Sequence, residues 1–110
     1  MSEHAMADEP VTLINVFEIK SDDLDAFMRQ WEDRAAFMGT QPGFRSFRLY
    51  RALSPDAHYQ LINVAEWDSE EDLRAATSSD RFQVSVRDSK AQFAFSASPA
   101  VYRAQLVVEG

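Results

Sequence analysis

Apolar residues along the chain follow two different periods. Residues 11–19 are rich in β-branched and aromatic side chains, which predicts a strand. From 24 to 38 the large apolar residues recur every three or four positions, as they do on one face of a helix. Ser21 is suited to the N-cap of this helix and Gly39 to its end. The pattern therefore predicts a strand followed by an amphipathic helix.

The middle of the chain predicts a hairpin and a second helix. Residues 44–53 and 58–67 have the composition of strands and flank a turn at 54–56. Ser69 and Asp72 then resemble a capping box, which marks the start of a helix. A helical region is therefore expected directly after the hairpin.

The last third of the chain completes the predicted order of elements. The helical region is expected to be interrupted near Ser78 and Ser79 and to end at Pro99, which has no backbone N–H. Residues 100–108 then predict a fourth strand. The order β-α-β-β-α-β is that of a ferredoxin-like α+β fold, whose central strands are the first and the third.

Both faces of the predicted sheet are apolar. In the first strand, Leu13 and Phe17 point to one face, whereas Ile14 and Val16 point to the other. An antiparallel sheet with one face in water would alternate apolar and polar residues. Two helices cover only one face, so the second face is expected to pack on a second copy of the chain. The sequence therefore predicts a homodimer with its sheets face to face.

Length and composition fit one domain. The chain has 110 residues, of which 45% are hydrophobic, and a single domain is expected over 11–110 behind a flexible tail at 1–10. Cysteine is absent, which excludes disulfides and thiol chemistry. The N-terminal residues lack the apolar stretch of a secretory signal, and no run approaches the roughly 20 residues of a membrane helix. A cytoplasmic protein without membrane contact is therefore expected.

Charge and residue types narrow the possible partners and cofactors. Eighteen acidic residues against eleven basic ones give a net charge of −7, which does not favour nucleic acid. Three glycines are too few and too scattered for a phosphate-binding loop. The two histidines, His4 and His58, belong to no cluster with metal-ligand spacing. Nucleic acid and a metal site are therefore not expected.

Polar residues inside two predicted strands are the candidates for a site. Asn15 and Asn63 interrupt apolar stretches, and Asn63 shares its face with Trp67. Because the two strands should be neighbours, these side chains could meet beneath the helices and form a small-ligand site. Each also has a structural interpretation, since a strand asparagine can bridge backbone groups and Trp67 can close the core. Trp31, on the apolar stripe of the first helix, is expected in the core.

Four segments carry a resemblance to a known family. They are V-T-L-I-N-V-F at 11–17, Q-P-G-F at 41–44, Y-Q-L-I-N-V-A-E-W-D-S-E at 59–70 and D-R-F at 80–82. In this order and spacing they resemble the antibiotic biosynthesis monooxygenase family over residues 10–108, which implies a dimeric α+β barrel. Within the family, the chain is most similar to the cofactor-independent monooxygenases of aromatic polyketide pathways.

The resemblance also implies roles for individual residues. One enzyme of this kind uses an asparagine of the first strand and the tryptophan that ends the third, which correspond to Asn15 and Trp67. Another uses an N-x-x-x-W arrangement that Asn63 and Trp67 match, together with a tyrosine where this chain has Leu73. The heme-degrading branch needs an axial histidine where this chain has Val86, so heme is not expected.

The implied activity is oxidation of an anthrone-type aromatic polyketide to a quinone by O₂ in antibiotic biosynthesis, without flavin, metal or heme. Asn15 would hydrogen-bond the anionic oxygen, Trp67 would donate its indole N–H, and Asn63 would orient the substrate. No residue stands out as a general base. Two alternatives remain open: a non-catalytic or stress-related barrel that binds a small aromatic ligand, and a polyketide cyclase or isomerase.

Overall fold

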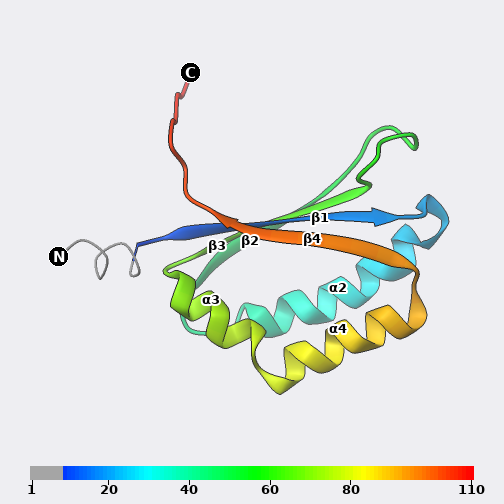
Figure 1. Ribbon diagram of the computed structural model, residues 1–110, viewed down its shortest axis with the longest axis horizontal. Helices are drawn as coiled ribbons and strands as arrows, with labels where there is room; N and C mark the ends of the chain where they lie inside the picture. The colour runs from blue at the N-terminus through cyan, green and yellow to red at the C-terminus, as the bar shows by residue number, and fades with distance from the viewer. Residues whose placement is uncertain (1–8) are drawn as a thin grey trace.

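The computed structural model describes residues 9–110 as one antiparallel sheet with helices on one side (Figure 1). Of the tail predicted at 1–10, only Glu9 and Pro10 belong to the described residues, and both are exposed. The elements in chain order are β1 (Val11–Ile19), the 3-10 turn η1 (Ser21–Asp23), α2 (Leu24–Met38), β2 (Phe44–Arg51), β3 (Leu61–Trp67), α3 (Glu70–Thr77), α4 (Asp80–Gln92) and β4 (Phe95–Tyr102).

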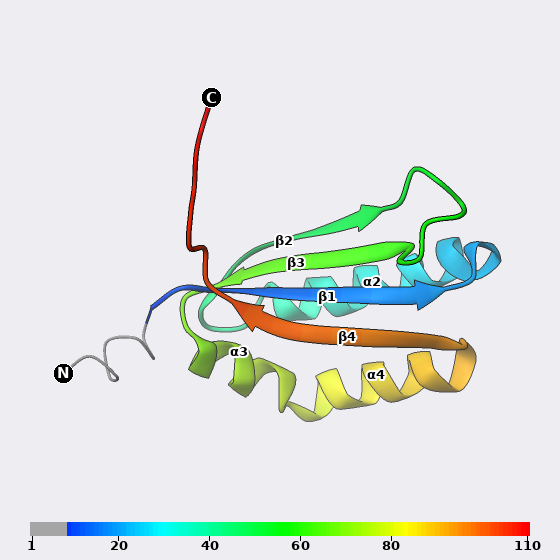
Figure 2. The same ribbon diagram turned by 45° about the horizontal axis from the view of Figure 1, so that its top comes forward.

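The strands are arranged in the order β2-β3-β1-β4, and every neighbouring pair is antiparallel. β1 and β3 are therefore central, as predicted. All three helices lie on the same side of the sheet, with α2 and α4 running side by side (Figure 2). Taking α3 and α4 as one helical region, the prediction of a ferredoxin-like α+β fold is confirmed.

Serine caps set the starts of the two later helices. Ser69 Oγ accepts a hydrogen bond from the N–H of Asp72 at 3.1 Å, and α3 begins at the next residue. Ser79 Oγ accepts from the N–H of Phe82 at 3.3 Å and starts α4 in the same way. The interruption predicted near 78–79 is therefore confirmed as the junction of two capped helices. No helix within residues 9–110 is long and apolar enough to cross a membrane.

The fourth strand is present, but its predicted bounds and the predicted role of Pro99 are wrong. α4 ends at Gln92, β4 spans Phe95–Tyr102 rather than 100–108, and Pro99 lies within this strand opposite Asn15. β4 pairs only with β1, and such an edge strand tolerates proline because one side of its backbone needs no N–H partner. The strand stops at Tyr102, opposite Thr12, because β1 itself begins only one residue earlier.

The hairpin strands are also shorter than predicted. β3 begins at Leu61 instead of residue 58, because Gln60 organises the loop before it. The Gln60 amide nitrogen donates to three loop carbonyls, those of Ser54, Pro55 and Ala57, at 3.2, 3.2 and 2.7 Å. A buried side chain thus holds the loop in place of a longer strand ladder.

The inner face of the sheet, which the helices cover, holds two separate clusters of buried apolar residues. One gathers around Trp67, and the other around Phe17 and Phe27. Between the two clusters, Asn15 pairs with Asn63 across β1 and β3. The two asparagines therefore interrupt the core at the centre of the sheet.

The outer face of the sheet is apolar at its centre. Ile14 pairs with Val64 and Val16 with Ile62, and we call these four residues the outer patch. They are half-buried by their neighbours in the sheet, and no helix of the described residues covers them (Figure 1). The sequence-based expectation of two apolar faces is thus confirmed for β1 and β3.

Candidate functional site

A cavity of about 780 Å³ lies between the inner face of the sheet and the helices, and we call it the inner cavity. Its walls are mostly apolar and come from all four strands and all three helices. The larger apolar residues that line it include Leu13, Phe17, Phe44, Phe47, Phe82 and Val86. Its volume falls within the range of about 300–1,000 Å³ that is usual for small-molecule sites.

The two predicted asparagines meet in this cavity. Asn15 and Asn63 are direct cross-strand partners, and both line the inner cavity. The Oδ1 atom of each is buried and has no hydrogen-bond partner among residues 9–110. An amide carries a donor and an acceptor that exchange by a half-turn of the group, so each can serve either kind of ligand atom. The pair therefore forms an unsatisfied polar centre in an apolar chamber.

Trp31 adds an indole donor to the same cavity. Its side chain is 8% exposed, packs edge-on against Phe17 at 5.8 Å between centroids, and stacks on Phe47 at 6.4 Å. The expectation of a core position is confirmed, but Trp31 also lines the inner cavity. Its Nε1 atom is buried and finds no acceptor in the described part of the chain. Trp31 is therefore a potential hydrogen-bond donor to a ligand.

Trp67 lies on the same face of β3 as Asn63 but outside the lining of the inner cavity. It is 1% exposed and packs edge-on against Phe44, with 5.4 Å between ring centroids. Its Nε1 atom also lacks a partner within the described residues. The structure thus brings Asn15 and Asn63 together, whereas Trp67 lies four residues along β3 from Asn63, beside its cross-strand partner Phe44.

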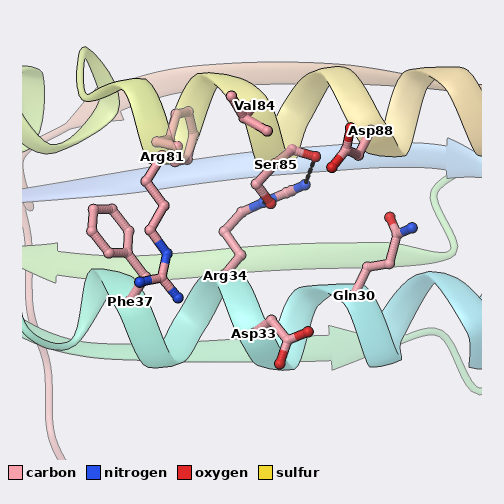
Figure 3. A pocket seen from close by; sticks show the side chains of 9 residues that line it. Gln30, Asp33, Arg34, Phe37, Arg81, Val84, Ser85 and Asp88 are labelled. Atoms are coloured by element: carbon pink, nitrogen blue, oxygen red, sulfur yellow. Dashed lines mark hydrogen bonds between the residues drawn. The ribbon is translucent and has the colours of Figure 1, made fainter.

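Arg34 extends from α2 toward α4 (Figure 3). It also lines the inner cavity. It is 5% exposed, and its guanidinium donates to Ser85 and Ser89 on α4. The cation also lies over the ring of Trp31, with Cζ 4.8 Å from the centroid. Burial lowers the pKa of Arg34 from its ordinary value. The cavity therefore has a positively charged wall.

The sequence pattern did not reveal either the charge or the indole donor on this wall. The buried residues of α2 are Leu24, Phe27, Trp31, Arg34 and Met38, which follow one helical stripe. Arg34 occupies a position where the stripe would normally hold an apolar residue. An arginine inside an otherwise apolar stripe was the signal that could have identified it.

The described residues offer no obvious metal site or histidine base for this cavity. No group of three or more His, Cys, Asp or Glu side chains in residues 9–110 is placed to hold a metal ion. His58 is exposed in the loop between β2 and β3, where its Nε2 lies 2.9 Å from Glu18. Val86, where the heme-degrading branch needs a histidine, contributes an apolar side chain to the inner cavity. The polar groups that line the cavity include two amides, an indole and a guanidinium.

Comparison with known proteins identifies the family. The family model for "Antibiotic biosynthesis monooxygenase" matches residues 10–88. No curated protein matches the chain significantly. A protein of known structure from Shewanella loihica PV-4, provisionally named a monooxygenase, is 37% identical with a TM-score of 0.73, covering 90% of this chain and 97% of that one.

Two more distant structures share the fold. SnoaB, a cofactor-independent oxygenase from Streptomyces nogalater, is 22% identical with a TM-score of 0.79, covering 93% of this chain and 99% of that one. A protein from Caulobacter crescentus CB15, provisionally named an antibiotic biosynthesis monooxygenase, is 14% identical with a TM-score of 0.77, covering 94% and 97%. Because the family model spans most of the chain, this protein belongs to the antibiotic biosynthesis monooxygenase family.

Proposed function

We propose that this protein is a cofactor-independent monooxygenase that oxidises an anthrone-type aromatic polyketide to a quinone with O₂. Membership in the family supports a monooxygenase-type function. The fold is shared with SnoaB, which is itself a cofactor-independent oxygenase. The substrate class and the link to antibiotic biosynthesis are the parts that we propose here.

The observation that supports this function best is the unsatisfied polar centre in the inner cavity. A buried polar atom without a partner costs about 1–3 kcal/mol, so a ligand that hydrogen-bonds to the amides of Asn15 and Asn63 would recover that cost. Such a cost is common at sites where a ligand supplies the missing partner. Aromatic walls on both sides of the pair suit a flat, polycyclic ligand.

The reaction needs little acid–base chemistry from the protein. An anthrone methylene loses two hydrogens, one oxygen atom of O₂ becomes the new carbonyl, and the other leaves as water. The electrons come from the substrate, whose deprotonated form is electron-rich enough to reduce O₂. The protein must therefore stabilise the enolate oxygen, hold the ring and exclude water.

The residues of the inner cavity fit these tasks. Asn15 turned with its amide N–H₂ toward the ligand would donate to the anionic oxygen, and Asn63 beside it would fix the orientation of the ring. Trp31 would supply the indole donor that the resemblance assigned to Trp67. Trp67 would act through Phe44 by supporting the wall of the cavity.

We further propose that the protein is a homodimer joined through the outer patch. The outer patch is contiguous across β1 and β3. Leaving these apolar side chains in contact with water would be unfavourable. A second copy presents the same patch, so a two-fold axis through the centre of the sheet would cover both. The two sheets would then form the dimeric barrel that the family resemblance implies.

The test of the function uses chelator-treated protein with 1,8-dihydroxyanthrone in aerated buffer. O₂ uptake and quinone absorbance should rise together, and Asn15→Ala should lower turnover about a hundredfold, as loss of one oxyanion donor does in other enzymes. Gln83→Ala is the control, because it removes an exposed amide of α4 that lies outside the lining of the inner cavity. It should leave turnover unchanged.

Other outcomes would distinguish the alternatives. Tight binding of the anthrone without O₂ uptake would indicate a ligand-binding barrel. Product formed equally well under argon would indicate a cyclase or isomerase. Turnover that Asn15→Ala leaves unchanged would rule out the role assigned to the asparagine.

A further inference from the structure

The guanidinium of Arg34 is buried with neutral partners only. Nε donates to Ser85 Oγ at 2.9 Å, and Nη2 donates to the Ser85 carbonyl at 2.9 Å and to Ser89 Oγ at 2.8 Å. Within residues 9–110, Arg34 forms no ion pair with a carboxylate. Arginine keeps its proton in proteins even when burial lowers its pKa. An uncompensated positive charge therefore lies inside the fold.

The position of this charge is fixed by a chain of hydrogen bonds. Ser89, itself 1% exposed, donates to Gln30 Oε1 at 2.6 Å, and the Gln30 amide nitrogen donates to Gln92. The ring of Trp31 supports the guanidinium from the other side. Nη1 of Arg34 makes no hydrogen bond to any described residue, so its two N–H groups are free for a ligand.

Arg34 borders two hollows, and their charges differ. A groove between α2 and α4 is also lined by Arg81, Asp33 and Asp88, so its two carboxylates offset its two guanidiniums (Figure 3). Neither carboxylate is within ion-pair distance of Arg34 in the described part of the chain. An anionic ligand of Arg34 is therefore favoured on the side of the inner cavity.

The inner cavity is cationic although the protein is acidic. Arg34, Arg74 and Lys90 line it, and Glu70 is the one carboxylate in the same lining. Glu70 lies 3.5 Å from Arg74, so these two charges offset each other and the positive charges of Arg34 and Lys90 remain. The whole chain has a net charge of −7, which makes this local excess of positive charge a specific feature of the cavity.

We propose that the ligand of the inner cavity is an aromatic acid whose carboxylate accepts a hydrogen bond from Nη1 of Arg34. The ring system would fill the apolar part of the cavity near Trp31, while the carboxylate supplies the partner that the buried cation lacks. This inference deepens the proposed function and depends on it only for the choice of a polycyclic ring. The carboxylate is present before and after oxidation, so substrate and product should both bind.

The experiment compares two stable analogues of the product, anthraquinone-2-carboxylate and anthraquinone-2-carboxamide. Neither consumes O₂, so their dissociation constants are independent of catalysis and can be measured by calorimetry or by quenching of tryptophan fluorescence. Wild-type protein should bind the carboxylate about 10- to 100-fold more tightly, as expected for a hydrogen bond to a charged group. Arg34→Gln should abolish this preference while retaining carboxamide binding.

The control variant is Arg81→Gln. Arg81 is on α4, lines the groove and lies over the ring of Phe37, but it does not line the inner cavity. This substitution removes the same charge, so the carboxylate preference of the variant should equal that of wild type. If Arg34→Gln fails to fold, Arg34→Lys can be used instead. It keeps the positive charge but loses the planar set of guanidinium N–H donors, so it should retain part of the preference for the carboxylate.

The wild-type measurement alone can overturn the inference. Equal affinity for the two compounds, or tighter binding of the carboxamide, would exclude a carboxylate at Arg34 and leave the oxygenase proposal intact. Binding of neither compound would exclude the polycyclic ring, and with it both proposals. Preference for the carboxylate without O₂ uptake from an anthrone would support the aromatic acid and reject the oxygenase.

Discussion

The inner and outer faces of the sheet are built from the same two central strands but differ at their centres. On the inner face, Asn15 and Asn63 meet with buried oxygens that have no partner among residues 9–110. Ile14 and Val64 are the chain neighbours of these two asparagines, and they pair with each other on the outer face, within the outer patch. At the centre of the sheet, the inner face is therefore polar and the outer face is apolar.

This difference indicates two kinds of partner. Amide oxygens without a partner in a mostly apolar cavity suit a molecule with both ring surface and polar atoms. A flat apolar patch without polar breaks needs an equally apolar surface, and burying it contributes about 25 cal/mol for each Å². We therefore assign a small aromatic ligand to the inner face and a second protomer to the outer face.

The largest effect is expected from a charge in the outer patch. In Ile14→Glu, the cross-strand neighbours are the apolar Val64 and Ala100, so the new carboxylates would be buried without a partner at the proposed dimer interface, at a cost of about 4 kcal/mol. That cost corresponds to a dimer dissociation constant raised about a thousandfold. Light scattering at micromolar concentration should give a dimer for wild type and a single 12.5 kDa chain for the variant.

The matched control for this charge is Ala91→Glu, which places a carboxylate on the exposed surface of α4 instead. It should remain a dimer. A wild-type protein with the mass of one chain would contradict the proposal for the outer face, and an Ile14→Glu dimer would show that the interface lies elsewhere.

An intermediate effect, with opposite signs for stability and activity, is expected from Asn63→Leu. Leucine has a similar size and removes a buried amide that has no partner, so the free energy of unfolding in urea should rise by about 1–2 kcal/mol. Turnover of the anthrone should fall about tenfold, because the ring loses one of its orienting groups. A less stable variant with normal turnover would show that the amide serves the fold rather than the ligand.

The smallest effect on catalysis is expected from Trp67→Phe, compared with Trp31→Phe as its partner experiment. Both changes remove an indole N–H, but only Trp31 lines the inner cavity. Trp31→Phe should lower turnover about tenfold, whereas Trp67→Phe should change it less than about threefold and lower the stability by about 1 kcal/mol. A larger loss of turnover in Trp67→Phe than in Trp31→Phe would show that Trp67 is the indole donor.

Much of the fold could be predicted because its determinants are local. The period of the apolar residues identified the strands, and the caps at Ser69 and Ser79 follow from short-range chemistry. Pro99 could not be interpreted in the same way. Proline ends a helix by a local rule, but it is tolerated at the edge of a sheet, and the edge position of β4 is set by the whole topology.

The candidate site was predictable only in part. Asn15 and Asn63 were identified because asparagine is unusual inside an apolar strand, and their pairing follows from the position of β1 beside β3. Arg34 escaped because its aliphatic stem fits an amphipathic stripe and only the packing of α4 buries its charge. Trp67 was placed on the correct face, but period-two counting does not tell where a cavity ends.

The two edges of the sheet have a consequence for how copies of this chain can associate. β4 is an edge strand with Pro99 near its middle. A strand of another chain that paired with this edge would find no N–H donor at Pro99. β2, at the opposite edge, carries Arg45, Arg48 and Arg51, all exposed. Proline and charge are the usual protection against strand-by-strand growth into fibrils. Both edges therefore disfavour open-ended polymerisation, which leaves the face of the sheet for the closed pair that we propose.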